Sequence, residues 1–363
     1  MAVMNEKEGK YMSYHDGMSA INLKMPSRVP RTEYSVENHW DLLSVVTGIE
    51  VDNESPQDLK ITAQRNFRKI WNYDFIWNTL IHGEIFGDLR TSMGHAVYQA
   101  EGVDYNNKIY CPFRDIEEVL DFDPWKAFGE RDIKKLTSDF EKNYQYKVEL
   151  YSDAVNMTGI YVTCMSGLID LFGWEMLLVS AGTDPEEFGE VANRYTSWIQ
   201  QYYNALAETR IPVVMVHDDI VWTEGPFLHP DWYRKYIFPN YKKLLAPLIE
   251  SSKKIMFTSD GNYTLFVDDI VACGVHGFVL EPVTDMKYIA EKYGKTHVFI
   301  GNADTRVLLN GTKEEIYSEV KRCMDIGKNC PGYFMAVGNH IPANTPVENV
   351  LYYNEVYEKL SKR

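Results

Sequence analysis

Imidazole, carboxylate and amide side chains are concentrated in five short clusters in the second half of the chain. Groups of these types placed side by side can transfer protons, hold a metal ion or bind polar groups of a substrate. Burying them is costly unless they pair with one another or with a ligand. Each cluster directly follows a short run of β-branched or aromatic residues, and the clusters are His217-Asp218-Asp219, Thr258-Ser259-Asp260-Gly261, Glu281-Pro282, Asn302-Ala303-Asp304 and Asn339-His340.

The apolar runs in front of these clusters predict the fold. They are short and lack strict alternation, as expected of strands buried on both faces, and strands alternate with helices, which indicates a parallel sheet. Polar residues gathered at the strand ends are typical of an α/β fold of the single (β/α)8 TIM-barrel type, with its site at the C-terminal face of the strands. We expect strands at Asp74–Leu80, Gly159–Cys164, Val213–His217, Lys254–Thr258, Gly277–Leu280, Val298–Gly301 and Tyr333–Val337, and an eighth near Gly94–Tyr98.

Helix signals lie between these strands. Asp184-Pro185 with Glu187, Thr312 with Glu315, and Thr345-Pro346 with Glu348 each predict a helix start. Gly327 suits the residue that follows the helix after Thr312, and Pro239 should kink or divide a helix between residues 230 and 252. We expect residues 1–60 to form an approach segment packed on the barrel, extended around Pro30, and residues 61–363 to form the barrel domain.

His217, Asp219 and Glu281 are the candidate catalytic residues, because each follows a predicted strand and carries a group that can exchange a proton. The alternative for the first cluster is that one Asp caps a helix while the His makes a structural hydrogen bond. For Glu281 the alternative is a salt bridge to a neighbouring loop.

Asp260, Glu281 and His340 offer oxygen and imidazole ligands, a set that suits Zn²⁺ with an open position. Asp260 could instead form an Asx-turn before Gly261, and His340 could be a structural hydrogen bonder. His82 and His95 stand beside glycines and could be loop residues near the same mouth. Further candidates for contact with a substrate are Asp218, Trp222, Asn78, Asn302 and Asp304, the last of which could simply cap a helix or pair with Arg306.

Composition narrows the classes of partner. The chain has 37 basic and 52 acidic residues, a net charge of −15, which argues against nucleic acid and against an anionic membrane surface. Its five cysteines contain no CxxC pair and indicate reduced thiols of a cytoplasmic protein. We find no apolar segment of a signal peptide and no apolar run long enough to span a bilayer. The 25 tyrosines and 8 tryptophans indicate a wide core and surface, or an aromatic-walled pocket.

The chain from about Pro212 to Glu358 resembles the uroporphyrinogen decarboxylase superfamily, with weaker similarity back to about residue 28. This resemblance implies a barrel enzyme from one of three branches: true decarboxylases, methyltransferases that use a corrinoid bound on a separate protein, and O-demethylase methyltransferases. The similar segments are His217-Asp218-Asp219 with Gly225 and His229-Pro230, Ser259-Asp260-Gly261, Gly274-Val275-His276-Gly277-Phe278, the stretch from Gly301 to Leu309 with Gly311-Thr312, and Thr345-Pro346 with Glu348-Asn349.

Departures from the family patterns favour the methyltransferase branches. The decarboxylases carry an Arg-Gln-Ala-Gly-Arg segment and a catalytic Asp after an early strand, whereas this chain has Ser27–Thr32 and Trp77-Asn78-Thr79 at those places. Methyltransferases that act on thiols hold zinc through His-x-Cys and a distant Cys, where this chain has Thr258-x-Asp260 and His340. A thiol acceptor is therefore not expected, while a metal with oxygen and imidazole ligands stays open.

We therefore expect a corrinoid-dependent methyltransferase with a small donor, for which a methoxylated aromatic compound is one choice. In O-demethylases a metal or a proton donor makes the leaving oxygen less basic, which the acidic and His residues here could supply. The corrinoid would arrive on a separate protein that docks at the barrel mouth, because the chain lacks an Asp-x-His-x-x-Gly cobalamin motif. The alternatives are a decarboxylase or other lyase acting on a carboxylated small molecule or tetrapyrrole, and a non-catalytic binder of such molecules. A homodimer is left open.

Overall fold

The structure is a computed structural model that describes residues 13–93, 96–99, 102–105 and 109–363. Its centre is a six-stranded parallel sheet in the order β14-β13-β12-β11-β8-β7. The six strands predicted from Gly159 onward are confirmed, and two of them have the predicted bounds. They are β7 (Thr158–Ile160), β8 (Val213–His217), β11 (Lys254–Thr258), β12 (Gly277–Val279), β13 (Val298–Ile300) and β14 (Tyr333–Phe334).

Two further segments connect the edges of this sheet and make it a barrel. Strand β1 (Phe75–Ile76) pairs in parallel with β6 (Val155–Asn156), which leads into β7, and Ile81 forms a parallel bridge with Ile160. On the other side, the amide of Met335 donates to the carbonyl of Pro30 at 2.8 Å, and the amide of Asp74 donates to the carbonyl of Arg31 at 2.9 Å. The segment around Arg31 therefore lies between β14 and β1.

This closing segment corrects the prediction of the eighth strand. Gly94 and His95 lie outside the described residues, and the rest of that prediction falls in β3 (Ala96–Gln99). Strand β3 pairs antiparallel with β4 (Gly102–Tyr105) in a two-stranded sheet apart from the barrel. The closing segment was not predicted as a strand because two arginines and a proline interrupt it. Arg31 is fully buried because it pairs with Glu33 at 3.0 Å and stacks on Trp71.

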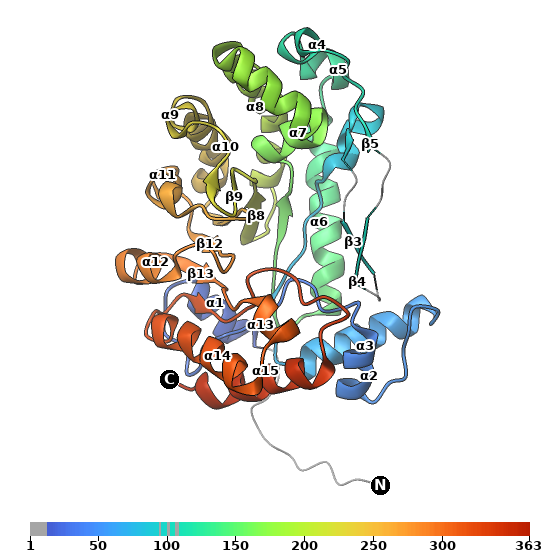
Figure 1. The fold of residues 1–363 in the computed structure, drawn as a ribbon, viewed down its shortest axis with the longest axis vertical. Coiled ribbons are helices and arrows are strands. Elements are labelled where there is room, and N and C mark those ends of the chain that lie inside the picture. Colours follow the sequence, from blue (N-terminus) through green and yellow to red (C-terminus); the bar gives the residue numbers. More distant parts are fainter. Residues whose placement is uncertain (1–12, 94–95, 100–101, 106–108) are drawn as a thin grey trace.

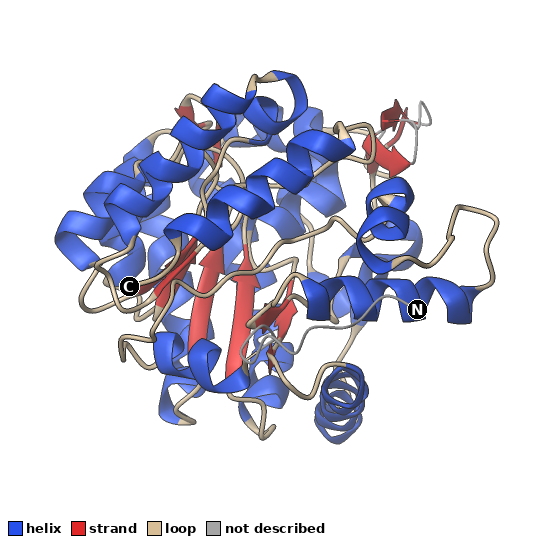
Figure 2. Ribbon diagram, turned by 90° about the horizontal axis from the view of Figure 1, so that it is seen from below, coloured by secondary structure: helices blue, strands red, loops and turns tan. Residues whose placement is uncertain are grey.

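The helices enclose the strands, as Figure 2 shows, and the C-terminal helices lie beside the N-terminal ones (Figure 1). Two antiparallel pairs, β2 (Ser92–Met93) with β5 (Ile109–Tyr110) and β9 (Val221–Trp222) with β10 (Gly225–Pro226), lie outside the barrel sheet. The helices are α1 (Tyr14–Ile21), α2 (Trp40–Thr47), α3 (Gln57–Ile70), η1 (Gly83–Leu89), α4 (Ile116–Leu120), α5 (Pro124–Phe128), α6 (Ile133–Leu150), α7 (Met165–Thr183), α8 (Pro185–Ala207), α9 (Pro230–Trp232), η2 (Tyr233–Ile237), α10 (Phe238–Glu250), η3 (Thr264–Phe266), α11 (Val267–Val271), α12 (Met286–Tyr293), α13 (Thr305–Asn310), α14 (Lys313–Gly327) and α15 (Val347–Leu360).

The predicted helix starts are confirmed at Asp184 and Thr312, whose side chains accept from the amides of Glu187 and Glu315. The start at Thr345 is wrong, because Pro346 has an extended ψ of 127° and α15 begins at Val347 without a side-chain cap. Pro239 stands in the first turn of α10, directly after a π-helical turn, which divides the helix as expected.

Gly327 is the last residue of α14 and does not follow it, which corrects the predicted C-terminal signal. A Cβ atom at this position would lie 2.4 Å from the ring of Tyr333. The glycine is therefore required for close packing of α14 on the strand that contains Tyr333.

Helix α7 has the length and hydropathy of a membrane-crossing helix, in contrast to the expectation that no apolar run is long enough. Asp170 and Glu175 interrupt it, and 61% of its most apolar 18-residue window is buried inside the fold. It packs against α8. These are the properties of a core helix of a globular domain.

The apolar core inside the barrel determines where the site begins. Val213 and Met215 of β8, Met256 of β11 and Val279 of β12 belong to one buried cluster in the barrel interior. Side chains alternate along a strand, so the next inward-facing residue of β8 after Met215 is His217. The cluster thus forms the floor beneath the C-terminal ends of the strands.

Candidate functional site

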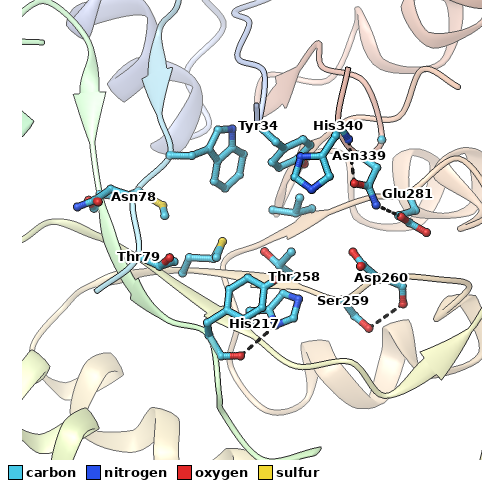
Figure 3. Close-up of a pocket in the computed structure, with 16 residues that line it drawn as sticks. Tyr34, Asn78, Thr79, His217, Thr258, Ser259, Asp260, Glu281, Asn339 and His340 are labelled. Carbon is cyan, nitrogen blue, oxygen red and sulfur yellow. Dashed lines mark hydrogen bonds between the residues drawn. The ribbon is translucent and has the colours of Figure 1, made fainter. Parts of the chain in front are cut away.

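A cavity of about 280 Å³ opens at the C-terminal end of the barrel (Figure 3). Met157, Met215 and Val279 form an apolar floor, continuous with the core inside the barrel. The predicted site residues Asn78, His217, Asp260, Glu281 and His340 line this cavity together with Tyr34, Trp77, Thr79, Tyr161, Thr258, Ser259, Gly338 and Asn339.

His217 is held in one orientation at the end of β8. Its side chain is 2% exposed, and Nδ1 lies 3.0 Å from the carbonyl oxygen of Tyr161. A carbonyl only accepts, so Nδ1 carries the proton of this contact. The ring of Tyr161 stacks on the imidazole with centroids 3.6 Å apart and planes within 10°. His217 therefore presents Nε2 to the loops after β8 and β11.

Asp219 and Asp260 complete a cluster around this nitrogen. Asp219 Oδ1 lies 3.3 Å from His217 Nε2 and accepts from the amide of Asp260 at 3.0 Å. The register of the sheet aligns these loops, because His217 pairs with Thr258 across β8 and β11. Among the residues that the structure describes, His217, Asp219 and Asp260 are the one group of three His, Cys or acidic residues whose ligand atoms all lie within 4.8 Å of one another.

The charges in this cluster change each residue's affinity for protons. Burial lowers the pKa of His217, but the carboxylate of Asp219 outweighs it and raises that pKa to about 9. Burial raises the pKa of Asp260 to about 7, and the charge of Asp219 reinforces the effect. Burial opposes ionisation of Asp219, yet the His217 imidazolium keeps its pKa below the usual value. The cluster therefore holds protons at neutral pH that could be donated or displaced.

Glu281 and His340 face the same cavity but have other partners (Figure 3). Glu281 Oε2 accepts from the amide of Gly261 at 2.8 Å, and its other oxygen accepts from the side chain of Asn339. His340 Nδ1 contacts the hydroxyl of Ser35. The predicted metal set of Asp260, Glu281 and His340 thus lines one cavity, but these three do not come within 4.8 Å of one another as a group.

Asp218 points away from the cavity, in contrast to its two neighbours. It is completely buried, and its carboxylate accepts from the amides of Cys164, Met165 and Ser166 at the start of α7 and from the hydroxyl of Tyr241. Its position fits the capping alternative and gives it no contact with a ligand in this cavity.

The remaining candidates lie around the cavity. The amide of Asn302 is buried and donates to the carbonyls of Glu281 and Thr284. Asp304 caps α13 and pairs with Arg306 at 2.6 Å. Trp222 of β9 is half exposed and packs on Trp174 and Phe227. The structure therefore gives Asn302 and Asp304 local structural contacts and places Trp222 on the surface.

The sequence left an aromatic-walled pocket open as an alternative but did not identify the residues of the wall. Tyr34 and Trp77 follow the two strands that close the barrel, and their rings are 4.6 Å apart. Tyr161 directly follows β7, and His82 stacks against it at 5.4 Å. Recognising the closing segment as a strand would have identified Tyr34, because a residue just beyond a barrel strand reaches the mouth.

The family model and the relatives that match this chain belong to the same family. The family model for uroporphyrinogen decarboxylase (URO-D) matches residues 147–360. Uroporphyrinogen decarboxylases of Geobacter sulfurreducens and Aromatoleum aromaticum are 25% identical over 179 residues and 29% identical over 175 residues. These alignments cover 49% and 47% of the chain and 51% and 47% of the relatives, so the chain matches about half the length of each.

A solved structure extends the likeness of fold to nearly the whole chain. A methyltransferase from Methanosarcina mazei superposes with a TM-score of 0.63 and 16% sequence identity, covering 96% of this chain and 99% of that one. At this identity the match is one of fold.

Proposed function

The chain belongs to the uroporphyrinogen decarboxylase family, and from that premise we propose that it is a methyltransferase that moves a methyl group between a small donor and a corrinoid carried by a separate protein. One observation carries this proposal. His217 and Asp260 of the acidic cluster line the cavity together with apolar and aromatic side chains, and none of the described residues that line it is Lys or Arg.

The composition of this cavity suits a methyl ether as the donor. When the methyl–oxygen bond of an ether breaks, the oxygen keeps the electron pair and must gain a proton or be stabilised by a positive charge. Asp260 and His217 both line the cavity, and Asp219 contacts His217 Nε2 and the amide of Asp260. We assign Asp260 the contact with the leaving oxygen, with His217 and Asp219 maintaining its charge state.

The aromatic and apolar lining fits the body of such a donor. Tyr34, Trp77 and Tyr161 can contact the flat faces of a methoxylated aromatic ring, while the methionines of the floor adapt to its edge. A volume of about 280 Å³ accommodates a small molecule of this kind. The corrinoid would accept the methyl group at the open side of the cavity.

The family name and the curated relatives favour the decarboxylase as a second candidate. A tetrapyrrole substrate carries several carboxylates, which proteins usually pair with Arg or Lys. The described lining has neither, and Asn78 and Thr79 stand at the cavity wall. A non-catalytic binder is the third candidate and would need no acidic cluster.

We propose that the protein works in a reducing compartment such as the cytoplasm, because all five cysteines are free thiols. Four of them are buried and unsuited to exchange with other thiols.

The test is a methyl-transfer assay with a panel of methoxyphenols and chemically reduced cobalamin, followed by the change in visible absorbance. We expect turnover with at least one donor and a decrease of about 100-fold or more for Asp260→Asn. The matched control is Asp325→Asn, an exposed carboxylate of α14 that pairs with Lys321. Carbon dioxide release from a carboxylated ligand would support the lyase, and ligand binding without any turnover would support the binder.

A further inference from the structure

We propose that His217, Asp219 and Asp260 together bind one divalent cation of the zinc class and leave a coordination position open to the cavity. The ion would bind in the site of the proposed function. A role of the ion in methyl transfer rests on that function, but binding of the ion can be measured without it.

The orientation of His217 suits a metal ligand. Its Nδ1 proton is taken by the carbonyl of Tyr161, so the nitrogen that faces the carboxylates is Nε2. Metal-binding histidines typically have this arrangement, in which one ring nitrogen donates to a carbonyl and the other coordinates. Nε2 is buried, and its contact with Asp219 at 3.3 Å does not have the geometry of a hydrogen bond. A buried nitrogen is costly unless a well-placed partner or a ligand satisfies it.

The distance between His217 and Asp219 also suits a metal ion. Two ligands of a tetrahedral Zn²⁺ with bonds of about 2.0–2.1 Å lie roughly 3.3 Å apart. The distance from His217 Nε2 to Asp219 Oδ1 is 3.3 Å. An ion-paired hydrogen bond between the same groups is typically about 2.7–2.9 Å long. The spacing therefore corresponds to the edge of a coordination tetrahedron.

Asp260 can complete the set of ligands. Its backbone amide donates to Asp219. Its side chain is reached by solvent although neighbouring groups crowd it, and its carboxylate accepts no hydrogen bond from the described part of the chain. Gly261 turns the chain directly after it with φ of +83°, where a Cβ atom would lie 2.6 Å from the carbonyl oxygen of Trp222. A small side-chain rotation of Asp260 can bring an oxygen to an ion that touches the other two ligands.

The donor set also indicates the class of ion. Imidazole nitrogen and carboxylate oxygen are both ligands of zinc, and three protein ligands leave the fourth position of a catalytic zinc site free for water or substrate. The described cysteines lie elsewhere, and four of the five are buried. The site would thus differ from a thiolate zinc site in its ligands and in the visible spectrum of its Co²⁺ form.

The test uses the purified chain, Zn²⁺ and Co²⁺ alone. We expect one equivalent of Zn²⁺ by equilibrium dialysis, and a visible Co²⁺ spectrum without the charge-transfer bands of thiolate ligands. His217→Gln and the isosteric Asp219→Asn should each weaken binding by about 100-fold or more. Glu281→Gln, His340→Ala and the surface control Asp325→Asn should keep the affinity within a few-fold.

Three results would overturn the inference. The first is that the unaltered chain binds no metal at micromolar free Zn²⁺. The second is that His217→Gln and Asp219→Asn bind Zn²⁺ as tightly as the unaltered chain. The third is that His340→Ala loses binding while those two variants keep it. Circular dichroism and thermal unfolding of each variant show whether a loss reflects misfolding, and the Co²⁺ spectrum of the unaltered chain reports the ligand type independently of any variant. Methyl transfer by a metal-free chain would show that the ion is not needed for the proposed function, and it would leave the binding measurements to decide the inference.

Discussion

The ring of Tyr161 lies flat on the imidazole of His217, with centroids 3.6 Å apart, and the backbone carbonyl of the same tyrosine accepts from Nδ1 of that imidazole. One residue therefore fixes both the plane and the tautomer of the histidine that faces the acidic cluster. A positively charged imidazole over an aromatic face is also stabilised by the electrons of the ring.

Tyr161→Leu should lower the pKa of His217 by roughly one pH unit, because it removes this aromatic face, whereas Tyr161→Phe keeps the face and should change it little. The measurement is the titration of the His217 ring by NMR in the metal-free protein. The role assigned to the stack is refuted if the two variants titrate alike.

Asp218 and Asp219 should differ sharply in their effect on stability although they are neighbours. Asp218→Ala removes a buried carboxylate that accepts four hydrogen bonds, and we expect it to cost about 3–5 kcal/mol of unfolding free energy. Asp219→Ala should cost less than Asp218→Ala, since Asp219 is partly exposed and contacts only the His217 imidazole and the Asp260 amide. Urea unfolding of both variants checks this, and equal losses would contradict the capping role.

Gly327→Ala should destabilise the protein even though it lies in a helix. Helix propensity alone would make the substitution stabilising by about 1 kcal/mol. The new methyl group would lie 2.4 Å from the ring of Tyr333, so either the ring or α14 must move. A raised melting temperature of the variant would show that α14 can shift at little cost.

The lowered pKa of Lys253 predicts that the stability of the protein depends on pH in alkaline solution. Burial lowers its pKa from 10.5 to about 8, while its ammonium donates to the carbonyls of Thr209 and Ile211. Between pH 8 and pH 10.5 the unfolded chain binds more protons at this position than the folded one, so this residue makes stability rise with pH in that window.

Lys253→Met should remove this rise, as measured by urea unfolding at a series of pH values. The comparison is between slopes, since the substitution also lowers the stability at every pH by removing hydrogen bonds. An unchanged slope would mean that Lys253 keeps an ordinary pKa in the folded state.

Metal affinity should increase with pH if the cluster binds zinc. The ion must displace the proton on His217, whose pKa is about 9, and the one on Asp260, whose pKa is about 7. Above pH 7 mainly the first proton remains, so affinity should rise about tenfold per pH unit up to pH 9. Dialysis at three pH values measures it, and a flat profile would place the ion elsewhere.

The sequence was sufficient for most of the barrel because its strands are encoded locally. β8 and β11 have the predicted bounds, since each is a continuous apolar run that ends in a polar cluster. The closing segment was missed because its burial depends on distant partners. Arg31 pairs with the neighbouring Glu33, but its burial also requires the rings of Trp71 and Tyr357, which lie far from it in the sequence.

Five of the candidate residues line one cavity at the C-terminal face of the barrel, whereas the contacts among the candidates were not predicted. Alternation along β8 turns His217 inward like Met215, and the next residue, Asp218, turns toward α7. That much could have been inferred from the strand. Which carboxylates meet His217 depends on the loops after β8 and β11, and in particular on the bond from Asp219 to the amide of Asp260, which no spacing in the sequence encodes.

Transfer of a labelled methyl group tests the central claim most directly. The donor is a methoxyphenol with a deuterated methyl group, incubated with the protein and reduced cobalamin, and both products are identified by mass spectrometry. The account predicts that the label appears on cobalamin, that the donor is recovered as the free phenol, and that Asp260→Asn forms little of either product. Label that stays on every donor tested, together with carbon dioxide released from a carboxylated substrate, would contradict it.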